Sequence, residues 1–396
     1  MKTIYFDNAA TTALRPEALE SMMPYLTNEY GNASSIYPLG QRSAAALRSA
    51  RSIIADALNA DAGEVYFTSC GSEADNWALK RVAHAYQDKG KHIITTAIEH
   101  HAILHSCAAL EKEGFEVTYL PVDAEGLVDP AVFESAIRPD TILASIMFAN
   151  NEIGTIEPIA ELAEIAHKHD VLFHTDAVQA FAHVPINVKE MNIDLLSASG
   201  HKFYGPKGTG FLYKRKGVRI TNLIDGGQQE SGLRAGTENI AGIVGMARAA
   251  ELALSEQADE MKRQSQLRDH AIERLLTEIP YTRVNGSRTS RLPNNINVCF
   301  RFIEGEGMLL QLAARGLCVS SGSACTSGSL DPSHVLLAIG LPHEIAHGSM
   351  RATIGRETTQ EDVDYLVDSL VTTISNLRSM SPLYEDFCAK QQKRAS

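Results

Sequence analysis

Short apolar runs alternate with amphipathic stretches between about residues 45 and 215, and this alternation constrains the fold more than any other feature. The runs EVYFTS, HIITTA, TILASIMFA and VLFHTDA are rich in apolar residues, and each of the first three precedes a stretch with helical periodicity. Buried runs separated by amphipathic helices are typical of a mainly parallel sheet covered on both faces. We therefore expect an α/β unit built around such a sheet.

The pattern changes after Gly236. A long helical stretch, residues 237–279, is followed by the runs NNINVCF and GLCVSS and by a helix that Thr359 is placed to cap. This order predicts a second, smaller α+β domain. We place the large domain at residues 15–256 and the small domain at residues 1–14 and 257–396.

Composition excludes several classes of protein. The 396 residues are 44% apolar and 21% charged, as in ordinary globular enzymes. The formal net charge of −12, with no run of five like charges, argues against a nucleic-acid partner or a membrane-surface patch. The N-terminus has no leader-like pattern, and no stretch approaches the length of a membrane span. We expect a cytoplasmic protein.

The cysteines predict free thiols. No Cys-x-x-Cys pair occurs, and six cysteines are sparse for this length, so a disulfide framework is not expected. Cys325 stands out because its surroundings, SSGSACTSGS, are small and polar, whereas a structural cysteine normally packs among apolar side chains. Cys325 is therefore either an accident of sequence or a reactive group.

Lys202 and Asp176 are the strongest catalytic candidates. Lys202 follows an apolar run in the turn SASGHKFYGPKG, where a strand would end at a site, although a solvated loop lysine fits the same letters. Asp176 ends the buried run VLFHTD and needs a cationic partner. That partner is either the protonated pyridine nitrogen of pyridoxal phosphate or an arginine or lysine in the core.

Two further segments begin helices at the ends of apolar runs. In FTSCGSEADN, Ser72 could hold a phosphate together with backbone amides, or it could simply cap the helix. In IEHHA, His100 could stack on a planar cofactor ring and exchange protons, or it could be a locally satisfied helix-start histidine. His101, His105 and Cys107 match no recognised metal motif, so we expect no metal site.

Six segments occur here in one order: YFDNAATT, GSEADN, FANNEIGTIEP, HTDAVQ, SGHKFYGPKG and SSGSACTSGSLDPSHVL. Together they resemble the cysteine desulfurases of the NifS/IscS family over essentially the whole chain. The resemblance implies a fold-type I pyridoxal-phosphate-dependent transferase of the class-V aminotransferase kind. Such a fold has a mainly parallel seven-stranded sheet covered by helices, and a smaller α+β domain.

The same resemblance implies a function. A desulfurase of this kind removes sulfur from L-cysteine, leaves L-alanine and carries the sulfur as a persulfide on Cys325. The sulfur then passes to an acceptor, such as a NifU- or IscU-like scaffold for iron-sulfur cluster assembly. Cys325 would need a mobile loop of small residues to reach both partners. Transient ligation of an iron-sulfur cluster by Cys325 is conceivable on the same grounds.

Residue roles carry over from the matching motifs. Lys202 resembles the lysine that holds pyridoxal phosphate and moves the α-proton of the substrate, and Asp176 resembles the partner of the pyridine nitrogen. His100 resembles the residue that stacks on the ring, and we expect it to handle the proton of the Cys325 thiol. The other implied roles belong to Gln179 at the phenolic oxygen of the ring, Gly71, Ser72, Ser199 and His201 at the phosphate, Asn151 and Arg351 at the cofactor and the substrate carboxylate, and Thr237 at the phosphate of a neighbouring subunit. The role of Thr237 implies a homodimer.

Some features leave alternatives open. Gly71 and Ser72 stand where IscS-like sequences commonly have alanine and threonine, and the C-terminus is shorter than the tail that IscS-type enzymes use for docking. The segment TSGSLDPSHVL is closer to NifS-like members. An aminotransferase or a selenocysteine lyase would keep Lys202 and Asp176 in the same roles. A non-catalytic iron-sulfur scaffold would use Cys325 as a ligand instead.

Overall fold

The computed structural model describes residues 3–321 and 332–395. Cys325 lies outside the described residues, so its predicted role is not tested by the structure. In the described ranges, no helix is long and apolar enough to cross a membrane.

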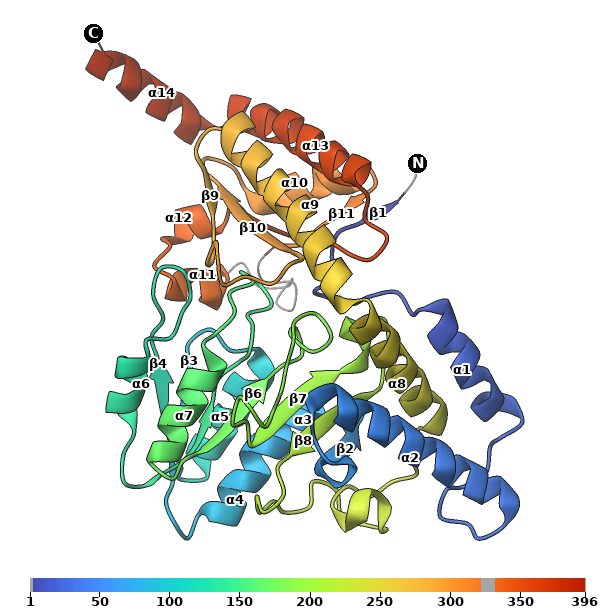
Figure 1. Cartoon of the computed structure of the whole chain (residues 1–396). Helices are drawn as coiled ribbons and strands as arrows, with labels where there is room; N and C mark the ends of the chain where they lie inside the picture. Colours follow the sequence, from blue (N-terminus) through green and yellow to red (C-terminus); the bar gives the residue numbers. More distant parts are fainter. Residues whose placement is uncertain (1–2, 322–331, 396) are drawn as a thin grey trace.

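A seven-stranded sheet forms the centre of the larger part of the molecule (Figure 1). Its strand order is β2-β8-β7-β6-β5-β3-β4, and only β8 runs antiparallel to its neighbours. The mainly parallel sheet expected from the sequence is thus confirmed. The strands are β2 (Val65–Thr68), β3 (His92–Thr96), β4 (Glu116–Leu120), β5 (Thr141–Ser145), β6 (Leu172–Asp176), β7 (Leu195–Ser199) and β8 (Gly210–Lys214).

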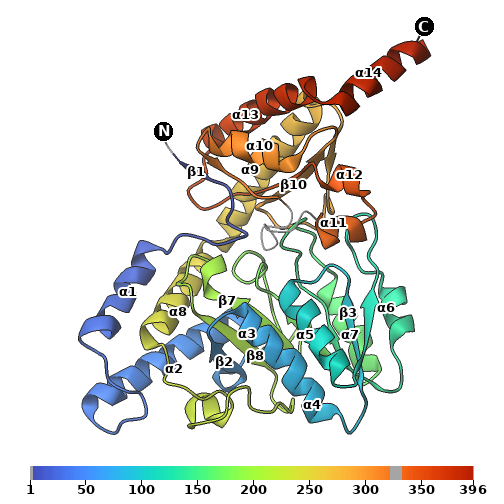
Figure 2. The same cartoon turned by 180° about the vertical axis from the view of Figure 1, so that it is seen from behind.

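Helices cover both faces of this sheet (Figures 1 and 2). Successive strand residues point to opposite faces, so Phe173 and Leu196 enter one core while Leu195 and Leu212 enter the other. The first core packs under α2 (Pro38–Leu58), α7 (Ile159–Lys168) and α8 (Ile240–Ser255), and the second under α3 (Gly71–Asn76), the π-helical turn Trp77–Arg81, α4 (Val82–Tyr86) and α5 (His101–Lys112). Further helices of this part are α1 (Pro16–Thr27) and α6 (Pro130–Ala136), with short turns at Ala62–Glu64, Gly200–Lys202 and Gln229–Gly232.

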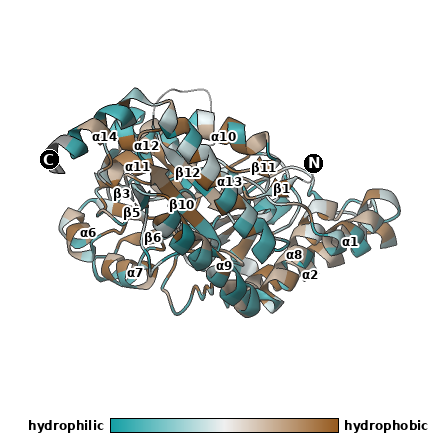
Figure 3. Cartoon of the chain, turned by 90° about the horizontal axis from the view of Figure 1, so that it is seen from above, coloured by the Kyte–Doolittle hydropathy of each residue, from teal (hydrophilic) through white to brown (hydrophobic). Residues whose placement is uncertain are grey.

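A second group of elements packs around two further cores, and the smaller of these, formed by α11 (His334–Ala338) and α12 (His343–Ala346), also includes Ile98, Met147 and Ile153 of the larger part. Its antiparallel sheet has the order β12-β10-β9, with β9 (Thr282–Val284), β10 (Asn295–Phe300) and β12 (Ser349–Thr353). The other helices are α9 (Gln257–Glu278), α10 (Gly305–Ala313), α13 (Gln360–Ser379) and α14 (Pro382–Ala395). In Figure 3 the buried strand β10 is mostly hydrophobic and α9 mostly hydrophilic.

The N-terminal segment belongs to this second group by pairing. Strand β1 (Ile4–Tyr5) runs parallel to β11 (Leu317–Cys318), and Phe6 is buried in the core that this second group forms around β10 and α13. The Thr359 cap of α13 is confirmed, because its side chain accepts a hydrogen bond from the Asp362 amide. The predicted domain boundaries at residues 14/15 and 256/257 remain predictions.

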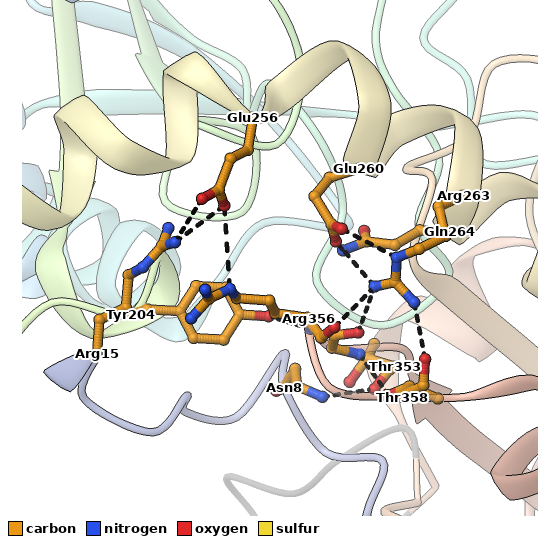
Figure 4. Close-up of polar contacts among 11 residues, drawn as sticks. Asn8, Arg15, Tyr204, Glu256, Glu260, Arg263, Gln264, Thr353, Arg356 and Thr358 are labelled. Atoms are coloured by element: carbon orange, nitrogen blue, oxygen red, sulfur yellow. Dashed lines mark hydrogen bonds and ion pairs between the residues drawn. The ribbon is translucent and has the colours of Figure 1, made fainter. Parts of the chain in front are cut away.

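The long helical stretch predicted from the sequence is divided in two at Glu256. Figure 4 shows the polar contacts around this break. Glu256 accepts two hydrogen bonds from Arg15, at 2.8 and 2.9 Å, and lies 3.9 Å from Arg356. The backbone amide of Arg356 in turn donates to the Tyr204 hydroxyl at 2.7 Å. This network ties the N-terminal segment and the loop before α13 to the turn that follows Lys202.

Candidate active site

A cavity of ≈ 320 Å³ lies where the sheet meets the second group of elements. Ten of the twelve predicted site residues line it: Gly71, Ser72, His100, Asn151, Asp176, Gln179, Ser199, His201, Lys202 and Arg351. Parallel strands place their carboxyl ends on one edge of a sheet, and ligands bind there in α/β folds. This explains why Asp176 at the end of β6 and Ser199 at the end of β7 reach the same cavity.

Two predicted residues lie apart from this group. Thr237 is exposed between the turn Gln229–Gly232 and α8, and it does not line the cavity. Cys325 lies outside the described residues. The structure therefore brings together the residues predicted to contact the cofactor and substrate within one chain, and leaves Thr237 on the surface.

Lys202 turns its amine into the cavity rather than into solvent. The side chain is half-buried, and Nζ donates to the carbonyl oxygen of Ala10 at 2.9 Å and to that of Ala9. The same Ala9 carbonyl accepts a hydrogen bond from Nε2 of Gln179 at 2.9 Å. These contacts do not fit a solvated loop lysine, and they show that the N-terminal segment forms one wall of the site.

Asp176 is buried at the end of β6. Its carboxylate accepts the Val178 amide at 2.9 Å. Burial raises the pKa of Asp176 to about 6, while the Val178 amide and the charge of Lys202 act in the opposite direction. No arginine in the described part of the chain pairs with this carboxylate, which argues against the core arginine that the sequence left open.

His100 caps the N-terminus of α5, which agrees with the prediction of a locally satisfied histidine at the start of a helix. Its Nδ1 accepts the Ala102 amide at 3.1 Å, so in the neutral ring the proton is on Nε2. Burial, followed by the charge of Lys202 and the neighbouring His101 and His105, lowers the pKa of His100 to about 4. In this state His100 is a hydrogen-bond donor through Nε2, and it can accept a proton only by giving up the cap.

The cavity also offers donors for an anion. The Ser199 hydroxyl is buried and has no hydrogen-bond partner among the described residues. The side chain of Ser72 is exposed and does not cap α3, whose N-cap is Cys70 without a side-chain cap bond, so the capping alternative is wrong. A Cβ on Gly71 would lie 2.6 Å from Cγ2 of Val178. The backbone there passes close to the wall, and only glycine fits without a shift.

Arg351 is held by two partners at the side of the cavity. Its Nη2 donates to Asp7 at 2.8 Å and its Nη1 to the Asn151 carbonyl at 3.1 Å, while its buried Nε has no partner among the described residues. A planar guanidinium with N–H groups to spare suits a carboxylate ligand. The ion pair with Asp7 was not expected from the sequence, since 343 residues lie between the two positions.

Sequence reasoning also missed buried acids at this site. Asp75, Glu99 and Glu152 line the cavity. Burial raises the pKa of Glu152 to about 7, and it raises that of Glu99 well above its usual range. Asp75 was detectable in principle, because it lies one helical turn after Ser72 and must share its face of α3.

The sequence pattern of the class-V aminotransferase family matches residues 4–366. The cysteine desulfurase IscS of Methanosarcina thermophila is 58% identical over 382 residues, which cover 96% of this chain and 94% of that protein. The cysteine desulfurase IscS of Clostridium botulinum is 54% identical over 99% of this chain and all of its own length.

Solved structures agree. A NifS-like protein superposes with a TM-score of 0.89 at 38% identity, covering 95% of this chain and 100% of that chain. SspA, solved in complex with cysteine, superposes with a TM-score of 0.80 at 39% identity, covering 89% and 99% respectively. The chain therefore belongs to the class-V aminotransferases and, within them, to the cysteine desulfurases of the IscS and NifS type.

Proposed function

We propose that this chain is a cysteine desulfurase that uses pyridoxal phosphate to remove sulfur from L-cysteine, releasing L-alanine and carrying the sulfur as a persulfide on Cys325. The observation that supports it most strongly is the cavity itself. An amine, that of Lys202, and a buried carboxylate, that of Asp176, line one space of a size suited to a small cofactor. An IscS-type identity over nearly the full length of the chain supports the substrate.

The residues present fit pyridoxal phosphate. The unpartnered Ser199 hydroxyl and the close backbone at Gly71 suit the phosphate, Asp176 suits the pyridine nitrogen, and the Lys202 amine suits the aldehyde carbon. When bound, the cofactor withdraws electrons from the substrate Cα and so eases loss of the α-proton and of the sulfur substituent. Asp176 would supply the negative charge that keeps the pyridine nitrogen protonated.

The chain's own groups then have distinct tasks. Arg351 would bind the substrate carboxylate through the N–H groups that Asp7 and Asn151 leave available. Lys202 would take and return the α-proton, held meanwhile by the carbonyl oxygens of the N-terminal segment. His100, neutral at physiological pH, would donate through Nε2 to a group in the cavity. A thiol entering the site would attack the substrate sulfur, so that an S–S bond forms as the Cβ–S bond breaks, and the electron pair left on the carbon side would be protonated to give alanine.

Persulfide formation is the direct test. After incubation with L-cysteine, mass spectrometry should find one added sulfur on Cys325 and one alanine released for each. Cys325→Ala should lose the persulfide but keep a yellow cofactor-bound protein, whereas Lys202→Ala should lose the colour. A persulfide on Cys70 or Cys318 instead would overturn the assignment.

The rival functions give different results in the same assay. An aminotransferase does not need Cys325, so Cys325→Ala would keep full activity and produce a keto acid rather than alanine. A selenocysteine lyase would act on selenocysteine and spare cysteine. A scaffold without catalysis would remain colourless with pyridoxal phosphate. The curated relatives carry the name cysteine desulfurase, which favours the first function.

We also propose a homodimer in which Thr237 reaches the cofactor site of the other copy. The region of α1 and the start of α2 carries an unusual set of exposed apolar side chains, with Ile36 93% exposed and Tyr30 73% exposed. Figures 1 and 3 show α1 at one edge of the molecule. Several large apolar side chains exposed in one region favour a protein interface there. The full set is Leu19, Met23, Leu26, Tyr30, Ile36 and Tyr37.

Light scattering on a sizing column tests the dimer. Ile36→Glu should shift the protein toward monomer and weaken its hold on pyridoxal phosphate, because Thr237 would be lost from the other site. Leu310→Glu, at an exposed position on α10, is the matched control and should stay dimeric. A wild-type monomer that keeps the cofactor would contradict the shared site.

We also propose an acceptor for the sulfur and a cellular compartment for the enzyme. The sulfur would pass to a NifU- or IscU-like iron-sulfur scaffold, in the cytoplasm, with any cluster ligation by Cys325 confined to the transfer itself. Transfer of labelled persulfide sulfur to a purified scaffold of this type, absent with Cys325→Ala, would support it. Sulfur leaving only as sulfide would argue against a dedicated acceptor.

A further inference from the structure

A second carboxylate lies beside Asp176 at the cavity. Asp75 of α3 is 1% exposed and Asp176 is 5% exposed. One potential ligand atom from each of Asp75, His100 and Asp176 lies within 4.8 Å of the others. Two buried carboxylates this close do not both ionise readily, so one of them tends to keep a proton.

Apart from the Ser197 side chain, little around Asp75 stabilises a negative charge. The Oδ1 atom of Asp75 has no hydrogen-bond partner among the described residues, and the nearest basic atom, Nε2 of His174, is 3.9 Å away. His174 is buried between the hydroxyls of Ser145 and Ser197, at 2.9 and 3.0 Å. Burial lowers the pKa of His174 to about 3, so the ring is neutral and supplies no positive charge.

The remaining groups that face Asp75 do not neutralise it either. Glu99, on the segment before α5, is buried and accepts hydrogen bonds from Thr96 and the Met147 amide at 2.8 and 2.9 Å. The nearby Cys70 thiol adds no positive charge. Burial comes first among the causes that raise the pKa of Asp75 well above its usual range and the charge of Asp176 comes second, while a hydrogen bond with the Ser197 side chain acts in the opposite direction.

Asp176 is the better anion of the two. It accepts the Val178 amide and feels the positive charge of Lys202, and Asp75 has neither. His100 is neutral above a pH of about 4. If the shared proton is on Asp75, then at neutral pH Asp176 is the one carboxylate of the pair that bears charge.

We propose that Asp75 stays protonated beside Asp176 and is a positioning residue, which limits the pair to a single negative charge directed at the cofactor's pyridine nitrogen. The role of the single charge toward the cofactor rests on the proposed function. The protonation of Asp75 is a property of the protein without cofactor, so the protonation of Asp75 and the proposed function can be refuted separately.

Thermal unfolding of the apoprotein tests the proton. Unfolded Asp75 ionises near its ordinary pKa, whereas folded Asp75 keeps its proton, so the contribution of Asp75 to wild-type stability falls as the pH rises above about 4. Asp75→Asn cannot ionise and should escape this loss. The Tm of the variant should therefore gain on wild type by about 3 °C or more between pH 5 and pH 7.

Asp56→Asn is the matched control, because Asp56 is exposed on α2 and its replacement should give no such gain. A Tm of Asp75→Asn that falls relative to wild type as the pH rises would overturn the proposal, since it would show an ionised, stabilising Asp75. If the asparagine variant does not fold, Asp75→Ser provides the same comparison.

Infrared spectroscopy gives an independent reading. In wild-type apoprotein labelled with 13C-aspartate, a protonated carboxyl band should be present at pH 7 and absent from Asp75→Asn. Absence of the band from wild type would overturn the proposal.

For the role toward the cofactor, Asp75→Asn should bind pyridoxal phosphate within about twofold of wild type at pH 7, and a loss of tenfold or more would refute the single-charge role. Failure of wild type to bind the cofactor would instead contradict the proposed function.

Discussion

Replacing Arg351 by lysine should separate substrate binding from cofactor binding. The guanidinium makes a 2.8 Å contact to Asp7 and a 3.1 Å contact to the Asn151 carbonyl, and its buried Nε has no partner among the described residues. A carboxylate ligand would therefore be held by the N–H groups that remain. Lysine has one nitrogen and cannot reproduce the planar pair of donors.

The magnitude follows from one lost charge-assisted hydrogen bond. Such a bond contributes about 1.5–3 kcal/mol, and each 1.4 kcal/mol is a factor of ten in binding. We therefore expect Arg351→Lys to lower kcat/KM for L-cysteine by about 10- to 150-fold, mainly through KM. Alanine release measured over a range of L-cysteine concentrations gives both constants, and the absorbance of bound cofactor should be unchanged.

Asp7→Asn is the matched control, because it breaks the same ion pair and keeps the guanidinium. The variant has no carboxylate at position 7 to compete with the substrate carboxylate for Arg351, so KM should stay level or fall. If Asp7→Asn lowers kcat/KM as much as Arg351→Lys, the arginine acts by holding the N-terminal segment, and the assignment to the substrate carboxylate is refuted. Loss of the cofactor from Arg351→Lys would refute it equally.

Three further substitutions test other parts of the site and its support. Gly71→Ala places a Cβ 2.6 Å from Cγ2 of Val178, so it should cost about 1–3 kcal/mol of stability in urea unfolding, and Val178→Ala in the same chain should restore most of it. Because the folded pKa of His100 is about 4 and its ordinary value is 6.5, the contribution of His100 to stability should fall as the pH drops from 6.5 toward 4. His100→Gln should show a shallower fall in Tm over that range, and an equal slope would contradict a neutral buried ring. Glu230→Gln should lower the free energy of unfolding by about 3 kcal/mol, because buried Glu230 accepts both Arg51 amino groups at 2.7 Å and the Phe67 amide at 2.9 Å; a loss below 1 kcal/mol would show that the pair contributes little.

Local sequence pattern was sufficient for the layers of the fold. Alternating apolar runs and amphipathic stretches predicted the mainly parallel sheet, because burial on both faces requires continuous apolar strands. The same logic located Lys202, Asp176 and His100 at strand ends, which meet at one edge of such a sheet. It did not predict that β8 runs antiparallel to its neighbours, because the residues of a strand do not determine whether that strand pairs parallel or antiparallel.

Other features depend on contacts between distant parts of the chain. The break at Glu256 is stabilised by Arg15 and lies close to Arg356, neither of which is near it in sequence. The carbonyl oxygen of Ala10 holds the Lys202 amine across 192 positions. No local periodicity encodes such pairs, because each forms only when two separately folded segments are packed together.

The sequence by itself determined which chemical groups the protein has and which faces of its strands and helices are apolar. Only the tertiary structure decided the charge that those groups carry. Asp75, Asp176 and His100 have ordinary pKa values in an unfolded chain, and folding shifts them because it removes water and sets their separations. Electrostatic energy depends on distance in space and on burial, and neither is a property of position along the chain.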